Sequence, residues 1–174
     1  MEKLWSPWRS QYIDSIKNKD KSQGCIFCEI SKLNENDLTN LLVDKGPLTF
    51  TVLNLYPYNN GHLMVLPYRH TSDFSSLTKE ESIEIMQKLQ LAEQALKSVL
   101  SPEGCNVGAN LGKVSGAGID EHLHFHIVPR WNGDTNFMPV IGKVKVISQD
   151  LAETKKNLLK AYLEIKKSIT STNK

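Results

Sequence analysis

Three histidines at alternate positions, His122, His124 and His126, constrain the fold of this chain more than any other feature of its sequence. Successive side chains of a β-strand point to opposite faces, so a strand over 121–128 puts the three imidazoles on one face, about 7 Å apart along the backbone. At that spacing they can converge on one anion or one metal ion. The opposite face is apolar and is expected to enter the core: Leu123, Phe125 and Ile127.

The other two histidines, His62 and His70, flank a second predicted strand over 62–66. An alternating segment over 48–53 precedes that strand, and the turn-forming sequence Tyr-Pro-Tyr-Asn-Asn-Gly over 56–61 connects the two. The pattern predicts an antiparallel hairpin. All five histidines of the chain therefore lie in two short stretches, with none left for scattered surface positions.

Two amphipathic helices are predicted from apolar residues at helical spacing. A capping box that begins at Thr78 starts the first helix, and Pro102 follows its end. The second helix covers about 151–169. A third strand is predicted over 104–111, between the first helix and the histidine-bearing strand. Hairpins with interspersed helices predict an α+β fold with an antiparallel sheet and two main helices.

The length of 174 residues suits one domain and is too short for two ordinary domains with a linker. We expect an N-terminal arm over 1–23 and a single domain over 24–174, with its motifs within 24–138. The formal net charge of +2 leaves no broad basic surface, so nucleic acid is not an expected partner. Residues 1–13 lack the continuous apolar stretch of a signal peptide, and no segment is long enough to span a bilayer. These features predict a cytoplasmic protein that does not bind membranes.

The alternating imidazoles have several possible roles. A neutral imidazole can be a nucleophile, a base or a metal ligand. A catalytic face is the favoured interpretation, a histidine-rich metal site is the second, and an accidental run of exposed histidines is the third. No propensity of histidine for alternate strand positions supports that last alternative.

The chain has three cysteines, and two of them form the sequence Cys25-x-x-Cys28. In a reducing compartment this pair indicates metal binding or redox chemistry rather than a disulfide. A thioredoxin-like pair is disfavoured because no βαβ pattern surrounds it, and two cysteines alone do not complete a metal site. Cys105 has no partner in the sequence and is expected to be a small buried residue of the third strand.

The sequence His-Leu-His-Phe-His-Ile-Val over 122–128 resembles the signature of the histidine triad (HIT) family. The similarity extends to the Gly-His element over 61–70 and to the Gly-Cys-Ile-Phe-Cys element that begins at Gly24. Residues 5–9 and 129–138 further resemble the branch that includes bacterial diadenosine-tetraphosphate phosphorylase-like proteins. The resemblance implies a HIT-like fold and a homodimer.

The resemblance also implies a reaction. The middle histidine, His124, would attack the α-phosphorus of a dinucleoside polyphosphate and form a nucleotidyl-histidine. A carbonyl near His122 would hold the Nδ1 proton of His124, so that Nε2 carries the lone pair. His126 would contact the phosphate or leaving group, and His62 would support it. Gly118 stands where many hydrolases of the family carry a serine or glutamine, which favours phosphorolysis as the second step.

Two further sets of residues follow from the resemblance. Nucleotide-binding positions are expected at Asn54, Asn110, Gly116, Gly118, Phe27 and Ile30, although ordinary turn and core roles suit the same residue types. One structural zinc ion per chain is expected at Cys25, Cys28, His70 and His122, with no organic cofactor. The alternatives for the function are a Hint-type nucleoside phosphoramidate hydrolase and a non-catalytic, zinc-stabilised nucleotide-binding or interaction protein.

Overall fold

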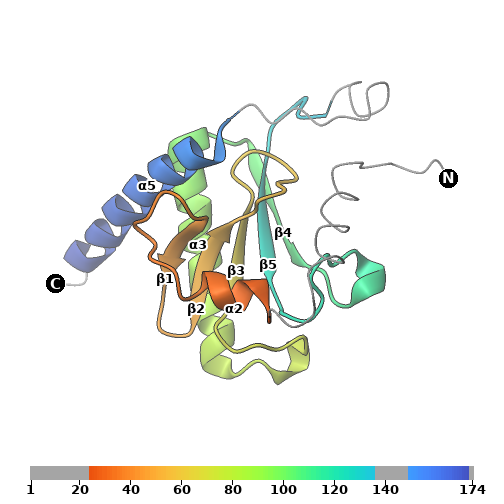
Figure 1. Ribbon diagram of the computed structural model, residues 1–174. Coiled ribbons are helices and arrows are strands. Elements are labelled where there is room, and N and C mark those ends of the chain that lie inside the picture. Colours follow the sequence, from red (N-terminus) through yellow and green to blue (C-terminus); the bar gives the residue numbers. More distant parts are fainter. Residues whose placement is uncertain (1–23, 136–148, 173–174) are drawn as a thin grey trace.

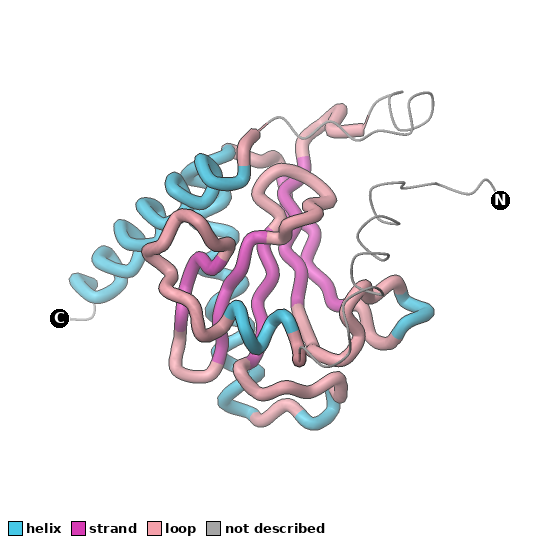
Figure 2. Tube along the Cα trace, viewed as in Figure 1, coloured by secondary structure: helices cyan, strands magenta, loops and turns pink. Residues whose placement is uncertain are grey.

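The computed structural model describes residues 24–135 and 149–172, and the expected arm over 1–23 and residues 136–138 lie outside this part of the chain. Five strands form one sheet in the order β1-β2-β3-β5-β4, and every neighbouring pair is antiparallel (Figures 1 and 2). The strands are β1 Leu42–Lys45, β2 Thr49–Leu53, β3 Leu63–Pro67, β4 Gly104–Ala109 and β5 Phe125–Arg130. The antiparallel α+β prediction is confirmed.

Helices cover both faces of this sheet (Figure 1). The two long ones, α3 Lys79–Leu100 and α5 Leu151–Thr172, pack on one face, and the short α2 Ile26–Ile30 packs on the other. Two single-turn 3-10 helices, η2 Phe74–Ser76 and η3 Lys113–Ser115, lie in the connections. No helix among the described residues is long and apolar enough to cross a membrane.

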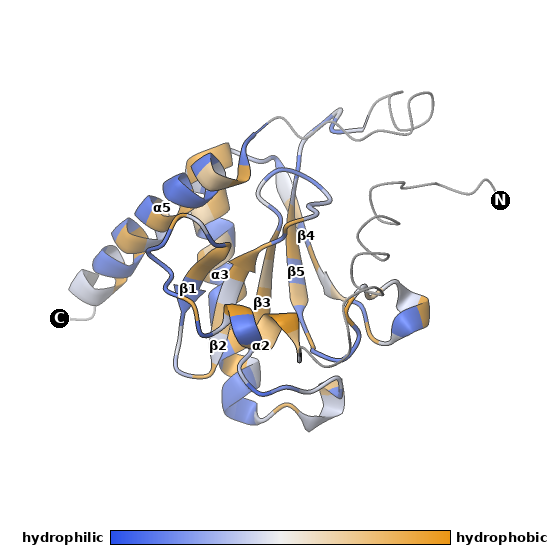
Figure 3. Cartoon of the chain, in the orientation of Figure 1, coloured by the Kyte–Doolittle hydropathy of each residue, from blue (hydrophilic) through white to orange (hydrophobic). Residues whose placement is uncertain are grey.

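The central strands β2 and β3 are buried along their whole length, because both of their faces are covered. Leu53, Leu63 and Val65 join the core beneath α3 and α5, whereas the alternate residues Phe50 and Met64 join Phe27 on the α2 face. Strands that are covered on both faces have continuous runs of apolar residues, and Figure 3 shows such runs at the centre of the sheet. The α2 face is the one that carries His126, which pairs with Met64 across the sheet.

The predicted hairpin is present as the antiparallel β2–β3 pair. Its turn requires Gly61, which has a φ of +72°, and a Cβ there would lie 2.4 Å from Cδ1 of Leu100. The capping box at Thr78 is also present, with Glu81 as its second member. Strand β1 and helix α2 were not predicted, because four and five residues carry too little periodicity.

The histidine-bearing strand differs from the prediction in where it begins. Strand β5 starts at Phe125 rather than at residue 121, so His122 and His124 precede it. The backbone N–H of Leu123 donates to the carbonyl of Thr71 at 2.7 Å, which takes this segment out of the sheet ladder. Cys105, expected to be buried, is only partly buried, because β4 is the last strand of the sheet.

Candidate functional site

His124 is buried and has a fixed tautomer. Its Nδ1 lies 2.8 Å from the carbonyl oxygen of His122, and because a carbonyl can only accept, the ring proton is on Nδ1. The lone pair is therefore on Nε2. Burial lowers the pKa of His124, which favours the neutral imidazole that a nucleophile requires.

His126 belongs to a chain of hydrogen bonds that begins on the β2–β3 loop. The backbone N–H of Tyr58 donates to Nδ1 of His62 at 3.0 Å, so the proton of a neutral His62 is on Nε2. That Nε2 lies 2.9 Å from Nδ1 of His126 and donates to it. Neutral His126 therefore carries its own proton on Nε2. The lone pair of His124 and the N–H of His126 are thus on rings whose centroids are 4.8 Å apart.

His124 and His126 line one cavity, whose other walls come from α2, β2, β3 and the loops beside them. Five of the six residues expected to bind nucleotide line the same cavity: Phe27, Ile30, Asn54, Asn110 and Gly118. Gly116 does not; it ends η3 in a left-handed conformation with φ 96°. An apolar cavity with a few convergent polar groups is typical of a site for a small organic ligand.

Asn54 has a structural role in this cavity as well as a place in its wall. Its side-chain amide donates to Nδ1 of His62 at 3.2 Å, and its carbonyl oxygen accepts from the N–H of Tyr56 at 3.0 Å. Its expected role in nucleotide binding remains a prediction.

The sequence analysis did not single out Tyr58. Its ring lies against His62, with centroids 4.7 Å apart, and against His126, with centroids 5.7 Å apart. It also lines the cavity. The sequence signal for it was an aromatic residue within a turn sequence, and such a residue does not by itself indicate contact with a site.

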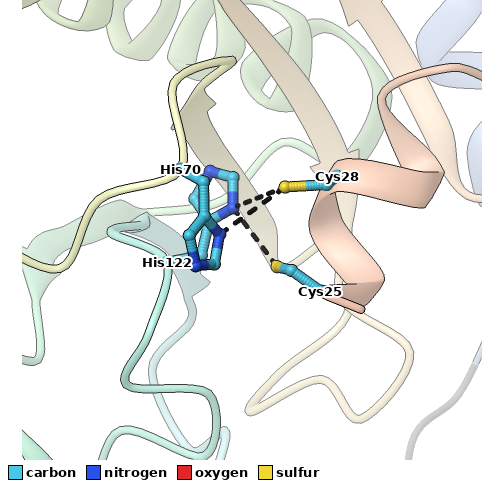
Figure 4. A group of neighbouring side chains, drawn as sticks. All are labelled: Cys25, Cys28, His70 and His122. Atoms are coloured by element: carbon cyan, nitrogen blue, oxygen red, sulfur yellow. Dashed lines mark hydrogen bonds between the residues drawn. The ribbon is translucent and has the colours of Figure 1, made fainter. Parts of the chain in front are cut away.

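A second cluster lies where α2 meets the segment before β5. The structure brings together Cys25, Cys28, His70 and His122, whose ligand atoms all lie within 4.8 Å of one another (Figure 4). Nδ1 of His122 is 3.4 Å from Sγ of Cys25 and 3.6 Å from Sγ of Cys28, and Nδ1 of His70 is 3.5 Å from Sγ of Cys28. Two thiols and two imidazoles that converge on one point are the set of ligands typical of a structural zinc site.

The orientation of His122 fits metal binding. Its Nε2–H donates to the carbonyl of Pro67 at 2.9 Å, which leaves the lone pair on Nδ1, directed at the two thiols. Metal-ligating histidines use their second nitrogen in this way. Burial lowers the pKa of His122 and keeps its ring neutral, while burial, as the largest cause, raises the pKa of Cys28. A bound cation would offset the free-energy cost of deprotonating a partly buried thiol.

The residues that flank His70 are held by the start of α3. Arg69 makes two hydrogen bonds with the carboxylate of Glu81, through Nε at 3.0 Å and through a terminal nitrogen at 2.8 Å. It also donates to the carbonyl of Ser76 at 2.8 Å. These contacts place the exposed His70 beside the buried His122.

Comparisons with known proteins agree with this geometry. Residues 35–133 match the family model of the HIT domain. The chain is 45% identical over 163 residues to an AP-4-A phosphorylase of Mycobacterium tuberculosis, in a match that covers 91% of this chain and 83% of that protein. The chain belongs to the HIT family.

Other HIT proteins are more distant. The adenosine 5'-monophosphoramidase of Schizosaccharomyces pombe is 32% identical over 108 residues, which is 62% of this chain and 75% of that protein. The crystal structure of a zinc-bound histidine triad family protein from Mycobacterium smegmatis superposes with a TM-score of 0.67 and 24% identity. That match covers 84% of this chain and 99% of the other and shows a common fold.

Proposed function

We propose that this HIT protein cleaves dinucleoside polyphosphates of the diadenosine tetraphosphate type and transfers the nucleotidyl group to inorganic phosphate. The observation that carries the proposal is the pair of fixed tautomers in one cavity. His124 presents a lone pair on Nε2, and neutral His126 presents an N–H, at rings that contact each other. A nucleophile beside a donor suits nucleophilic displacement at phosphorus.

In the first step Nε2 of His124 forms a bond to the α-phosphorus, and the bond from that phosphorus to the bridging oxygen breaks. The lone pair moves into the new N–P bond, and the polyphosphate leaves with the electrons of the broken bond as ATP. The carbonyl of His122 accepts from Nδ1–H and stabilises the positive charge that develops on the ring. The Nε2–H of His126 would donate to a phosphate oxygen as negative charge develops there.

In the second step an oxygen of inorganic phosphate attacks the same phosphorus, and His124 leaves as neutral imidazole. The products from diadenosine tetraphosphate and phosphate are then ATP and ADP. Similarity to an AP-4-A phosphorylase over most of the chain supports phosphate as the acceptor. Gly118 lines the cavity and has no side chain, so it offers no hydroxyl or side-chain amide to a leaving group.

The decisive experiment is to incubate the pure protein with diadenosine tetraphosphate, with and without inorganic phosphate, and to separate the products. A phosphate requirement with ATP and ADP as products supports the proposal. AMP and ATP formed without phosphate would show that water resolves the intermediate. Adenosine phosphoramidate serves as a parallel substrate, and turnover of it alone would favour the monophosphoramidase alternative.

We also propose that Cys25, Cys28, His70 and His122 hold one structural zinc ion per chain. The zinc-bound relative from Mycobacterium smegmatis supports this proposal alongside the donor set of this chain. These four residues would hold the ion, which when bound would link α2 to the segment that leads to His124. The ring centroids of Phe27, on α2, and His124 are 5.3 Å apart. The position of α2 therefore affects the packing around the ring of His124. The thiols must stay reduced to bind metal, which suits the cytoplasm.

Homodimerisation completes the proposal, with a second copy of this chain paired along β4. This strand is the last of the sheet, and Val107 at its centre is 55% exposed. Unprotected edge strands favour pairing with another strand. Light scattering after size exclusion should give twice the mass of the chain, and Val107→Asp should shift it toward the monomer. A monomer at all concentrations of the unmodified protein contradicts this arrangement.

A further inference from the structure

The turn that follows β5 is joined to the catalytic histidines by a continuous path of hydrogen bonds. Asn59, on the β2–β3 loop, donates from its side-chain amide to a carboxylate oxygen of Asp134 at 2.9 Å. The same amide nitrogen donates to the carbonyl of Pro129 at 3.1 Å. The loop is thus held to the far end of the strand on which His126 lies.

Asp134 is itself tightly held. Its side chain is 7% exposed and accepts two hydrogen bonds from Arg130, through Nε at 2.5 Å and through a terminal nitrogen at 2.9 Å. The backbone N–H of Trp131 donates to the same carboxylate at 3.2 Å. A carboxylate with a charged donor and a backbone donor has one orientation, so it is a rigid anchor for the amide of Asn59.

The anchored residue lies next to the group that sets the tautomers. Tyr58, adjacent to Asn59, supplies the backbone N–H that donates to Nδ1 of His62. The carbonyl of Asn59 accepts from the backbone N–H of His62 at 3.2 Å. The loop therefore bonds to both the ring and the backbone of His62, and His62 in turn donates to His126.

We propose that Asn59 and Asp134 are positioning residues, which keep His62 and His126 in the tautomers that put the ring proton of His126, a residue lining the cavity, on Nε2. Neither residue lines the cavity, so each acts through the loop rather than by touching substrate. If the anchor is lost, Tyr58 N–H moves away from Nδ1 of His62. The longer hydrogen bond from the side-chain amide of Asn54, at 3.2 Å, then holds Nδ1 as an acceptor less firmly than the two donors do together, and a share of His62 can carry its proton on that atom. In that share of molecules His62 has no Nε2 proton to donate, and His126 loses the constraint on its own tautomer.

This proposal rests on the proposed function for its effect on turnover, but its primary test does not. Proton–nitrogen correlation spectra of the imidazole rings distinguish Nδ1–H from Nε2–H in the free protein. In the unmodified chain we expect His62 and His126 to be protonated on Nε2. In Asn59→Ala, and in the isosteric Asp134→Asn, we expect averaged ring-nitrogen shifts for both histidines.

The matched control is Glu103→Ala. Glu103 accepts from the backbone N–H of Asn132 at 3.0 Å, so this change loosens the same turn without touching Asn59. We expect its ring spectra to match those of the unmodified chain. With diadenosine tetraphosphate as substrate, kcat should fall about 10- to 100-fold in the two test variants with little change in KM.

Unchanged tautomers in Asn59→Ala and Asp134→Asn overturn the proposal, whether or not kcat falls. Tautomers that also change in Glu103→Ala overturn it too, since any loosening of the turn would then suffice. Thermal unfolding of each variant identifies a chain that fails to fold, and Asp134→Asn is the milder change if Asn59→Ala does. Failure of the unmodified protein to cleave the dinucleotide refutes the proposed function and leaves the tautomer test intact.

Discussion

The Nδ1–H of His124 donates a hydrogen bond of 2.8 Å to the backbone carbonyl of His122, two residues earlier in the chain. This short-range contact determines that the lone pair of the buried, neutral ring is on Nε2. Because the acceptor is a backbone atom, the arrangement does not depend on the side chain at position 122. The ring of His122 can therefore face the thiols of Cys25 and Cys28 while its carbonyl serves His124.

Replacement of the proposed nucleophile, His124, should abolish the covalent step. In His124→Ala, no nitrogen remains to attack phosphorus, and turnover of diadenosine tetraphosphate should fall about a thousandfold or more. No nucleotidyl adduct should be visible by mass spectrometry of the denatured protein after rapid mixing with substrate. A variant that retains turnover or adduct would refute the assignment of His124.

The cysteine cluster predicts a defined metal content. Protein purified without chelators should carry about one zinc ion per chain by elemental analysis, and Cys28→Ser should lower that ratio and the Tm, since binding contributes to folding. Cys105→Ser is the matched control, because Cys105 lies on β4 and is not one of the four clustered residues. Equal zinc contents in the two variants, or a content far below one in the unmodified chain, would count against the site.

The buried carboxylate of Glu81 predicts a loss of stability in acid. Its hydrogen bonds with Arg69 are the largest cause of a lowered pKa, from an ordinary value of 4.5. The stabilisation is present above pH 4.5 and is lost as the pH falls through the lower folded-state pKa. The free energy of unfolding, measured with urea, should decrease from pH 6 to pH 3, and Glu81→Gln should flatten that decrease.

Its neighbour Glu80 provides the control for this titration. Glu80 is exposed in the same first turn of α3, so Glu80→Gln should leave the pH dependence of the unfolding free energy nearly unchanged. If Glu80→Gln flattens the profile as much as Glu81→Gln, the Arg69 contact is not its source.

Asp44 should be the most sensitive charged residue of the core. It is 2% exposed and forms ion pairs with Lys88 of α3 and Lys166 of α5. Asp44→Ala leaves the buried Lys88 ammonium without its partner carboxylate, and we expect a loss of about 3–5 kcal/mol of stability in urea unfolding. The side chain of Lys166 is 42% exposed, so Lys166→Ala should cost about 1 kcal/mol or less. Similar losses of unfolding free energy in Asp44→Ala and Lys166→Ala would contradict the expectation that the more buried partner contributes more.

Much of the fold followed from local patterns. The β2–β3 hairpin, the start of α3 at its capping box and the long α5 were predicted because each has a period or a turn signal of its own. Strand β1 and helix α2 were missed because they are short and are held by the sheet. The displaced start of β5 was missed for a related reason, since the hydrogen bond from Leu123 goes to Thr71, a residue far away in sequence.

The sequence by itself determined that three imidazoles alternate beside an apolar face, and that two cysteines lie three positions apart. Only the tertiary structure decided which partner each ring takes. Pro67 accepts from His122 across 55 positions of the chain, and His62 donates to His126 across 64. A local pattern specifies the period of an element but not what packs against it. The proposed metal ligand His122 and the proposed nucleophile His124 are therefore distinguished only when distant strands meet.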